Sequence, residues 1–174
     1  REYLEYLQAD KKANHIGEDF RSRILITWKY IKCLRKLEYV LNCKKGMLSQ
    51  IELYYLKYKW YRLSVKTGIT LPPNTFGKGV YIPHFGAIVV NPSARFGDYC
   101  VIQNGVNISN DVIGRNHIYL GAGAKIMIGV HIEDDVIVGA NAVVTKDIDE
   151  PNIVVAGLPA KKISGKGFRD RKTV

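Results

Sequence analysis

Residues 88–144 read IVVNPSARFGDYCVIQNGVNISNDVIGRNHIYLGAGAKIMIGVHIEDDVIVGANAVV. Small or apolar residues recur in this stretch every six positions, and a second apolar series runs two positions behind the first. Only Gly114 interrupts the second series. The first series is Ile88, Ala94, Cys100, Val106, Val112, Ile118, Ala124, Val130, Val136 and Ala142, and the second is Val90, Phe96, Ile102, Ile108, Gly114, Leu120, Ile126, Ile132, Val138 and Val144.

This six-residue period predicts a coil of parallel strands with three flat faces. Each unit supplies one short strand and one turn, so eighteen residues complete a coil and apolar positions stack on their equivalents above and below. The Gly, Asn and Asp residues between the apolar positions suit the corners, where tight turns are needed. Chance spacing in an ordinary β-rich domain is the alternative, but it would not sustain the period over so many units.

Residues 1–66 show a different spacing. Apolar residues recur there every three or four positions, first from Ile24 to Leu41 and again from Leu48 to Leu63, with Gly46 between the two stretches. This spacing predicts two helices with a turn at Gly46, and residues 2–12 indicate a short helix before them. Stripes of this kind usually pack in a core or against another subunit, so we assign them no chemistry.

The spacing changes at residues 67–74, which read TGITLPPN. Two consecutive prolines cannot continue a helix. We therefore expect a mainly β protein with a small helical N-terminal domain over residues 1–68, a β-helix over residues 69–165 and a basic C-terminal tail over residues 166–174.

The formal charge of +10 is concentrated near the N-terminus, because residues 1–66 hold 15 of the 26 Lys and Arg but only 7 of the 16 Asp and Glu. They also hold both Trp and eight of the 11 Tyr. Such a basic, aromatic segment suits peripheral contact with an anionic membrane, although a solvated helix face over packed aromatics explains the same composition. No groove-reading motif is present, so we expect no nucleic-acid partner.

Cys33, Cys43 and Cys100 show neither metal-ligand spacing nor the pattern of a disulfide framework. This indicates reduced thiols in the cytoplasm and no bound metal. No run approaches the length needed to span a bilayer, and nothing visible looks like a signal peptide. We expect a cytoplasmic protein, with the inner face of the membrane as the place of any lipid contact.

Four segments resemble the hexapeptide-repeat acyltransferases, and within them the serine acetyltransferases, while the helical front resembles the short helical domain of the O-acetyltransferases of capsule gene clusters. The four segments are residues 76–84 (FGKGVYIPH), 120–126 (LGAGAKI), 138–144 (VGANAVV) and 155–161 (VAGLPAK). The resemblance spans roughly residues 69–165. It implies a left-handed parallel β-helix, acetyl-CoA as the acyl donor, and a homotrimer whose sites are completed between subunits.

The resemblance places His84 at the position of the general base. An imidazole suits that role because its ordinary pKa of about 6.5 leaves a neutral nitrogen available. A histidine with a purely structural role is the alternative. His117, beside the Gly114 irregularity, and His131, at an outward repeat position, are weaker candidates. His15 lies in the helical segment and has no counterpart in the family.

Acetyl-CoA contacts are also assigned by the resemblance. Ala122 and Ala140 match the alanines that contact the pantetheine arm, although their spacing of eighteen residues fits tight corner packing equally well. Lys161 and Lys162 are candidates for the CoA phosphates, with solvated lysines as the alternative. The backbone N–H groups of Ser109-Asn110 are candidates for stabilising the oxyanion near the thioester.

Three positions depart from serine acetyltransferases. Ile69 stands where they carry the aspartate that orients the histidine, and Pro83 stands where they carry an aspartate that helps to hold the amino acid. Ser109-Asn110-Asp111 passes directly into Val112, without the inserted loop whose Arg-His pair binds the serine carboxylate. An α-amino acid needs such charged partners, since a buried charge without one costs several kcal/mol.

The leading hypothesis is therefore acetyl transfer to a hydroxyl of a surface-polysaccharide precursor, a glycan acceptor without those charges. Serine O-acetylation in cysteine synthesis is the alternative, favoured by the overall resemblance. A catalytically inactive β-helix that serves as a scaffold is the second alternative, and Ile69 in place of the aspartate is its best support.

Overall fold

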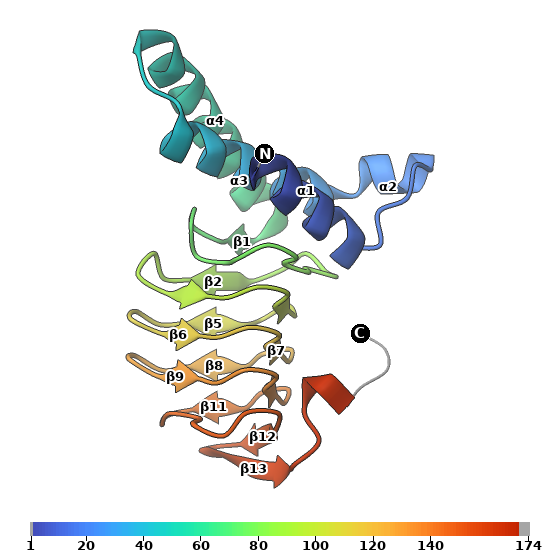
Figure 1. Ribbon diagram of the computed structural model, residues 1–174, viewed down its shortest axis with the longest axis vertical. Helices are drawn as coiled ribbons and strands as arrows, with labels where there is room; N and C mark the ends of the chain where they lie inside the picture. Colours follow the sequence, from blue (N-terminus) through green and yellow to red (C-terminus); the bar gives the residue numbers. More distant parts are fainter. Residues whose placement is uncertain (1, 171–174) are drawn as a thin grey trace.

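A computed structural model describes residues 2–170 and shows a column of short strands with a group of helices across one end (Figure 1). The helices are α1 (Glu2–Ala13), α2 (Phe20–Ile24), α3 (Ile26–Cys43) and α4 (Met47–Thr67). The helices predicted on either side of Gly46 are confirmed, whereas α2 is a short helix that the spacing did not indicate. Within the described residues, no helix is both long and apolar enough to cross a membrane.

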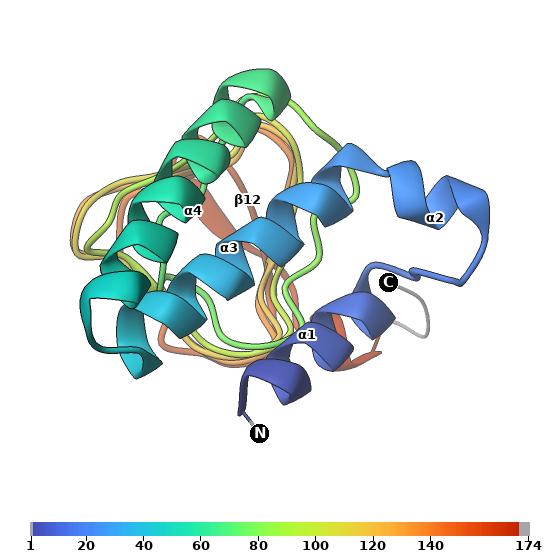
Figure 2. The same cartoon turned by 90° about the horizontal axis from the view of Figure 1, so that it is seen from above.

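The two long helices lie side by side (Figure 2) and differ in the face that they bury. The predicted stripe of α3 is buried along most of its length, with Trp28, Ile31 and Leu34 packed against the first coil, whereas its two ends, Ile24 and Leu41, are exposed. The predicted stripe of α4 is exposed from Leu48 to Tyr58, whereas Leu63 at its end packs against the core. Of the two expectations for such a stripe, core packing does not hold for most of α4, whose other side meets α3, and contact with another subunit stays a prediction.

The strands form a parallel β-helix, as the six-residue period predicts. Three sheets run along the column, in the orders β1-β2-β5-β8-β11, β13-β12-β10-β7-β4 and β3-β6-β9. Their bounds are β1 (Ile69–Thr70), β2 (Ile88–Val90), β3 (Arg95–Phe96), β4 (Val101–Ile102), β5 (Asn107–Ile108), β6 (Ile113–Gly114), β7 (Tyr119–Leu120), β8 (Lys125–Ile126), β9 (His131–Ile132), β10 (Ile137–Val138), β11 (Val143–Val144), β12 (Val154–Gly157) and β13 (Ala160–Ser164).

Both apolar series of the repeat lie inside the column, and every one of their residues is buried. Gly114, the one interruption, makes room for an aromatic stack. A Cβ at Gly114 would lie 2.3 Å from the ring of Phe96, which stacks on Phe76 with ring centroids 4.7 Å apart. The missing side chain is therefore a packing requirement of the core.

The far end of the column is closed by the antiparallel hairpin β12–β13. A 3₁₀ turn at Phe168–Asp170 then folds back along the side, where Arg169 donates to Asp135 at 2.5 Å. The predicted basic tail over residues 166–174 is described only as far as residue 170, and its last four residues lie outside the described part of the chain.

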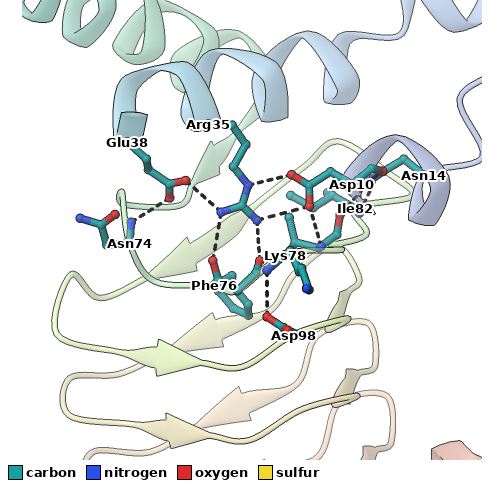
Figure 3. Close-up of polar contacts among 11 residues, drawn as sticks. Asp10, Asn14, Arg35, Glu38, Asn74, Phe76, Lys78, Ile82 and Asp98 are labelled. Atoms are coloured by element: carbon teal, nitrogen blue, oxygen red, sulfur yellow. Dashed lines mark hydrogen bonds and ion pairs between the residues drawn. The ribbon is translucent and has the colours of Figure 1, made fainter. Parts of the chain in front are cut away.

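At the near end, Arg35 lies at the centre of a buried polar cluster between the helices and the first coil (Figure 3). Its Nε donates to Asp10 at 2.7 Å, and its Nη1 donates to Glu38 at 2.9 Å. The guanidinium also donates to the backbone carbonyls of Phe76 and Gly77, at 3.0 and 2.5 Å. The helices are thus bonded to the backbone of the coil beneath them.

The acidic and amide side chains of the helices accept backbone N–H groups from the same coil. Asp10 accepts from the N–H of Val80 at 2.9 Å, Glu38 from that of Asn74 at 2.8 Å, and Asn14 from that of Ile82 at 3.2 Å. The first coil has no coil above it to satisfy these groups, and unpaired buried N–H groups are costly. The helices therefore cap the β-helix chemically as well as sterically.

Candidate functional site

The three sheets meet at three corners, and one of them brings together several residues singled out from the sequence. We call it the His84 corner: residues 83–87, 103–105, 121–123 and 139–141, which join the β4-β7-β10 sheet to the β2-β5-β8-β11 sheet. Backbone hydrogen bonds link its successive turns, from Gly123 N–H to the Asn104 carbonyl at 2.9 Å and from Asn141 N–H to the Ala122 carbonyl at 2.8 Å. His84, Ala122 and Ala140 therefore lie along one edge of the column.

His84 has an exposed imidazole on a backbone that is held in place. The N–H of Gly86 donates to the Thr67 carbonyl at 2.8 Å, and a Cβ on Gly68 would lie 3.0 Å from the Gly86 carbonyl carbon. The end of α4 thus fixes the turn that carries the histidine. Within residues 2–170, no hydrogen bond or ion pair reaches the imidazole itself.

Ile69 is placed where it cannot orient His84. Its side chain is 0% exposed and belongs to the core cluster, and the residue pairs with Ile88 between β1 and β2. An aspartate there would bury a carboxylate in an apolar core, which is unfavourable without a partner. The apolar residue at this position is therefore part of the packing of the first coil.

The small residues of the His84 corner are packed closely. A Cβ at Gly121 would lie 2.7 Å from the backbone nitrogen of Ala140, so the two turns leave no space for a side chain between them. Ala122 is half-buried and Ala140 is exposed. Tight corner packing thus accounts for Gly121, and the small side chains of Ala122 and Ala140 lie along the outside of this edge.

Asn104 is a polar residue of this corner. From the sequence we predicted only that it lies in a turn, and not that it lies near His84. Its side chain is exposed one coil below His84, and a Cβ on Gly86 would lie 3.4 Å from its Cβ. The signal in the sequence was its spacing of eighteen from Ala122, which places it on the same edge.

Ser109 and Asn110 lie at a different corner, between β5 and β6, so one chain does not bring them to His84. The N–H of Ser109 already donates to the Ile126 carbonyl at 3.0 Å. It is therefore not free to stabilise an oxyanion, which corrects that part of the expectation. Among the described residues, the exposed Asn110 has no hydrogen-bond acceptor for its N–H. The chain passes from Asp111 directly toward β6, without an inserted loop.

Lys161 and Lys162 lie on β13, at the end of the column opposite the helices (Figure 1). Lys162 pairs with Glu150 at 2.5 Å, which leaves Lys161 as the exposed cation of the two without an ion pair in the described part of the chain. These lysines share a sheet with β10 and β7, so the alanines of the His84 corner lie between them and the histidine along the column.

The other histidines lie elsewhere. His131 is exposed on β9, and His15 packs edge-on against Tyr81 with ring centroids 5.7 Å apart. His117 lies at the third corner, stacked on Tyr99 at 5.5 Å and 3.5 Å from Asp135. No group of three or more potential metal ligands occurs within residues 2–170.

Comparison with known proteins agrees with this architecture. Residues 112–146 match the model of a family described as the hexapeptide repeat of succinyl-transferase. The chain is 32% identical over 112 residues to the serine acetyltransferase of Synechococcus elongatus, an alignment that covers 59% of this chain and 46% of that protein. It is 35% identical over 108 residues to the serine acetyltransferase of Mycobacterium tuberculosis, covering 57% of this chain and 47% of that protein.

The fold is also shared with a solved structure. The serine acetyltransferase of Brucella abortus in complex with coenzyme A superposes with a TM-score of 0.72 and 24% identity, covering 96% of this chain and 68% of that one. The match extends over the helices as well as the β-helix. The chain spans about half the length of the two curated relatives named above.

Proposed function

We propose that this chain, which carries the hexapeptide repeat and is related to serine acetyltransferases, is an O-acetyltransferase that moves acetyl from acetyl-CoA to a hydroxyl. The observation that carries the proposal is the His84 corner, where an exposed imidazole lies on the same edge as Ala122 and Ala140. A reactive base above a shallow, small-residue edge suits an extended thioester laid along the column.

In the proposed reaction, His84 accepts the proton of the acceptor hydroxyl as its oxygen bonds to the thioester carbonyl carbon. The C–S bond of the resulting tetrahedral intermediate then breaks, the acetyl group stays on the acceptor as an ester, and the thiolate of CoA takes the proton from the imidazolium. A general base of this kind accelerates transfer by about 10²–10⁴-fold. Of the two N–H groups considered for the oxyanion, that of Asn110 remains available.

A homotrimer completes the site in this proposal. His84 and Asn110 lie at two corners of one chain, so a neighbouring copy is needed to bring one corner to the other. Beside Asn110 the surface is apolar, with Ile113, Met127 and Ile128 exposed by 48%, 42% and 62%. Burial of such a patch between subunits supports the assembly. Lys161 is the residue we assign to the CoA phosphates.

For the acceptor, the relatives support L-serine better than a polysaccharide sugar, because the curated proteins that match over half of this chain are named serine acetyltransferases. We therefore propose serine as the first acceptor to test. Acetylation of a capsule sugar finds no support among these relatives.

A sugar hydroxyl remains the second candidate because of three positions in this chain. Ile69 is in the core, Pro83 carries no charge, and the turn after β5 has no insertion. None of these three positions supplies a charged partner for an amino acid, whereas a neutral sugar needs none.

The test is release of CoA thiol from acetyl-CoA, measured with L-serine and with a panel of neutral sugars as acceptors. We expect His84→Ala to lower the rate by about 10²–10⁴-fold, since it removes the base. His117→Ala is the matched control, because the His117 side chain is also exposed but lies at the third corner, which the proposed trimer does not use.

The outcomes separate the alternatives. Turnover with serine and not with sugars assigns the acceptor as serine, and the reverse result assigns a sugar. If the protein fails to bind acetyl-CoA in calorimetry, the β-helix is a scaffold and the proposal is wrong. Equal activity of the His84 and His117 variants would exclude His84 as the base.

A further inference from the structure

Helix α4 has an outer apolar face that nothing in the described chain covers. Its inner face carries Leu56, Trp60 and Leu63, which pack against α3 and the core. On the opposite face, eight large side chains are exposed by 58–83%. We call them the α4 stripe: Met47, Leu48, Ile51, Tyr54, Tyr55, Tyr58, Tyr61 and Val65. A helix that is apolar on both sides is normally buried on both.

The stripe is graded along the helix. Its aliphatic residues Met47, Leu48 and Ile51 lie in the first turns of α4, next to the α3–α4 turn, which is the part of the helices furthest from the β-helix (Figure 1). Four tyrosines follow in the middle of the helix. Aliphatic groups at a tip with tyrosines behind them match the polarity gradient from the acyl region of a membrane to its headgroups, where tyrosine is enriched.

The charges around the stripe are almost all positive. Between residues 44 and 67 the chain has six Lys and Arg but a single carboxylate, Glu52. Glu52 already pairs with Lys44 at 2.6 Å and with Lys36 at 3.3 Å. The five other cations of this segment are exposed, and they are Lys45, Lys57, Lys59, Arg62 and Lys66. An apolar face flanked by exposed cations is complementary to an anionic lipid surface.

A second copy of the chain fits the same face less well. Paired helices are normally matched by opposite charges along the edges of their contact, and here Lys57 and Arg62 have no exposed acidic counterpart on α4. Two α4 stripes face to face would also bury tyrosine hydroxyls that need hydrogen-bond partners. Both problems disappear when the partner is a layer of anionic headgroups.

We propose that the α4 stripe docks the protein on an anionic membrane surface, with Met47, Leu48 and Ile51 inserted and the tyrosines at headgroup level. The helix lies in the interface and does not span it. This inference is independent of the acceptor of the acetyl-transfer reaction, and an inactive protein would show it equally.

The test is co-sedimentation of the full chain with vesicles of phosphatidylcholine alone or mixed with phosphatidylglycerol. We expect binding to the anionic vesicles, weakened by added salt because the cations contribute. Leu48→Ser lowers the binding constant by about tenfold, since it removes one inserted aliphatic side chain. Ile163→Ser is the matched control: Ile163 is 66% exposed but lies on β13, at the opposite end of the molecule.

A second readout uses a native cysteine beside the α3–α4 turn. Cys43 is exposed, whereas Cys33 and Cys100 are buried. Burial raises the pKa of the Cys33 thiol and raises that of Cys100 to about 12, so an environment-sensitive maleimide labels Cys43 selectively. Its emission should shift to the blue when anionic vesicles are added, and Leu48→Ser should remove most of that shift.

Three results would overturn the proposal. They are absence of binding to anionic vesicles, equal binding of the Leu48 variant and the native chain, and a labelled Cys43 that does not sense the vesicles. If Leu48→Ser instead lowers the mass measured by light scattering while vesicles bind neither protein, the stripe is an interface between copies of this chain.

Discussion

At the scale of single residues, Arg35 makes the central polar contacts between the helices and the β-helix. It is 2% exposed and donates to two carboxylates and two backbone carbonyls. Burial alone would lower the pKa of its guanidinium. The negative charges of Glu38 and Asp10 raise the pKa by more than burial lowers it, so the net shift is upward. Arg35 therefore stays charged. It stabilises the fold by pairing carboxylates and carbonyls that would otherwise be buried without partners.

Replacement of Arg35 by methionine tests this account. The change leaves Asp10 and Glu38 without their cation, and breaking a buried pair in this way costs about 3–5 kcal/mol in the free energy of unfolding. Urea unfolding followed by circular dichroism measures the loss. Lys36→Met is the control, since Lys36 pairs with Glu52 at the surface, and such a pair contributes about 1 kcal/mol or less. Equal stability of the two variants would contradict the proposed role of Arg35.

At the scale of structural elements, each coil is held by contacts that repeat every eighteen residues. The backbone ladders pair equivalent residues of successive coils, such as Asn107 with Lys125, and the apolar series fill the space between the sheets. Gly114 shows how strict this packing is, because Phe96 from the coil above occupies the space that a side chain would need.

Gly114→Ala should therefore destabilise the β-helix by about 1–3 kcal/mol, the usual cost of overpacking a core. Shortening the ring with Phe96→Leu should restore part of that loss when the two changes are combined. Thermal unfolding of the single and double variants measures both effects. Gly165→Ala is the control, since a Cβ there meets nothing within 4 Å. Purely additive losses in the double variant would show that Phe96 is not what excludes the methyl group.

At the scale of the whole molecule, the column presents different chemistry in different directions. The helical end carries the α4 stripe, one corner carries His84 with the alanines, and the next corner carries Asn110 beside an apolar patch. A trimer would bring the His84 corner of one subunit to the Asn110 corner of the next, with α4 at one end of each column. Acyl transfer and membrane docking would then use separate surfaces of one assembly.

Charge placed in the apolar patch should dissociate the proposed trimer. Ile128→Glu puts a carboxylate on a residue that is 62% exposed in the single chain and that the proposed trimer would bury between subunits. We expect the mass from light scattering to fall toward that of one chain, 19.6 kDa, together with loss of acetyl transfer. Leu4→Glu changes an equally exposed residue of α1, at 59%, and should leave the mass unchanged. A native protein that is already monomeric would exclude the trimer.

The sequence by itself determined the features that repeat along the chain. The six-residue period predicted the β-helix and its buried residues, and the spacing of eighteen placed Ala122 and Ala140 on one edge. These predictions are correct because each coil contacts its neighbours through equivalent positions, so a local pattern implies the packing. The resemblance to acyltransferases added His84, which the structure places on the same edge.

Only the tertiary structure decided how the non-repeating parts meet. Asp10, Arg35 and Asn74 are far apart in the chain, and no periodicity indicates that they share one buried cluster. Likewise, α4 is apolar on two sides, so its sequence cannot tell which side α3 covers and which remains for a partner. Contacts of this kind arise from the docking of separate elements, and the sequence of each element alone does not contain them.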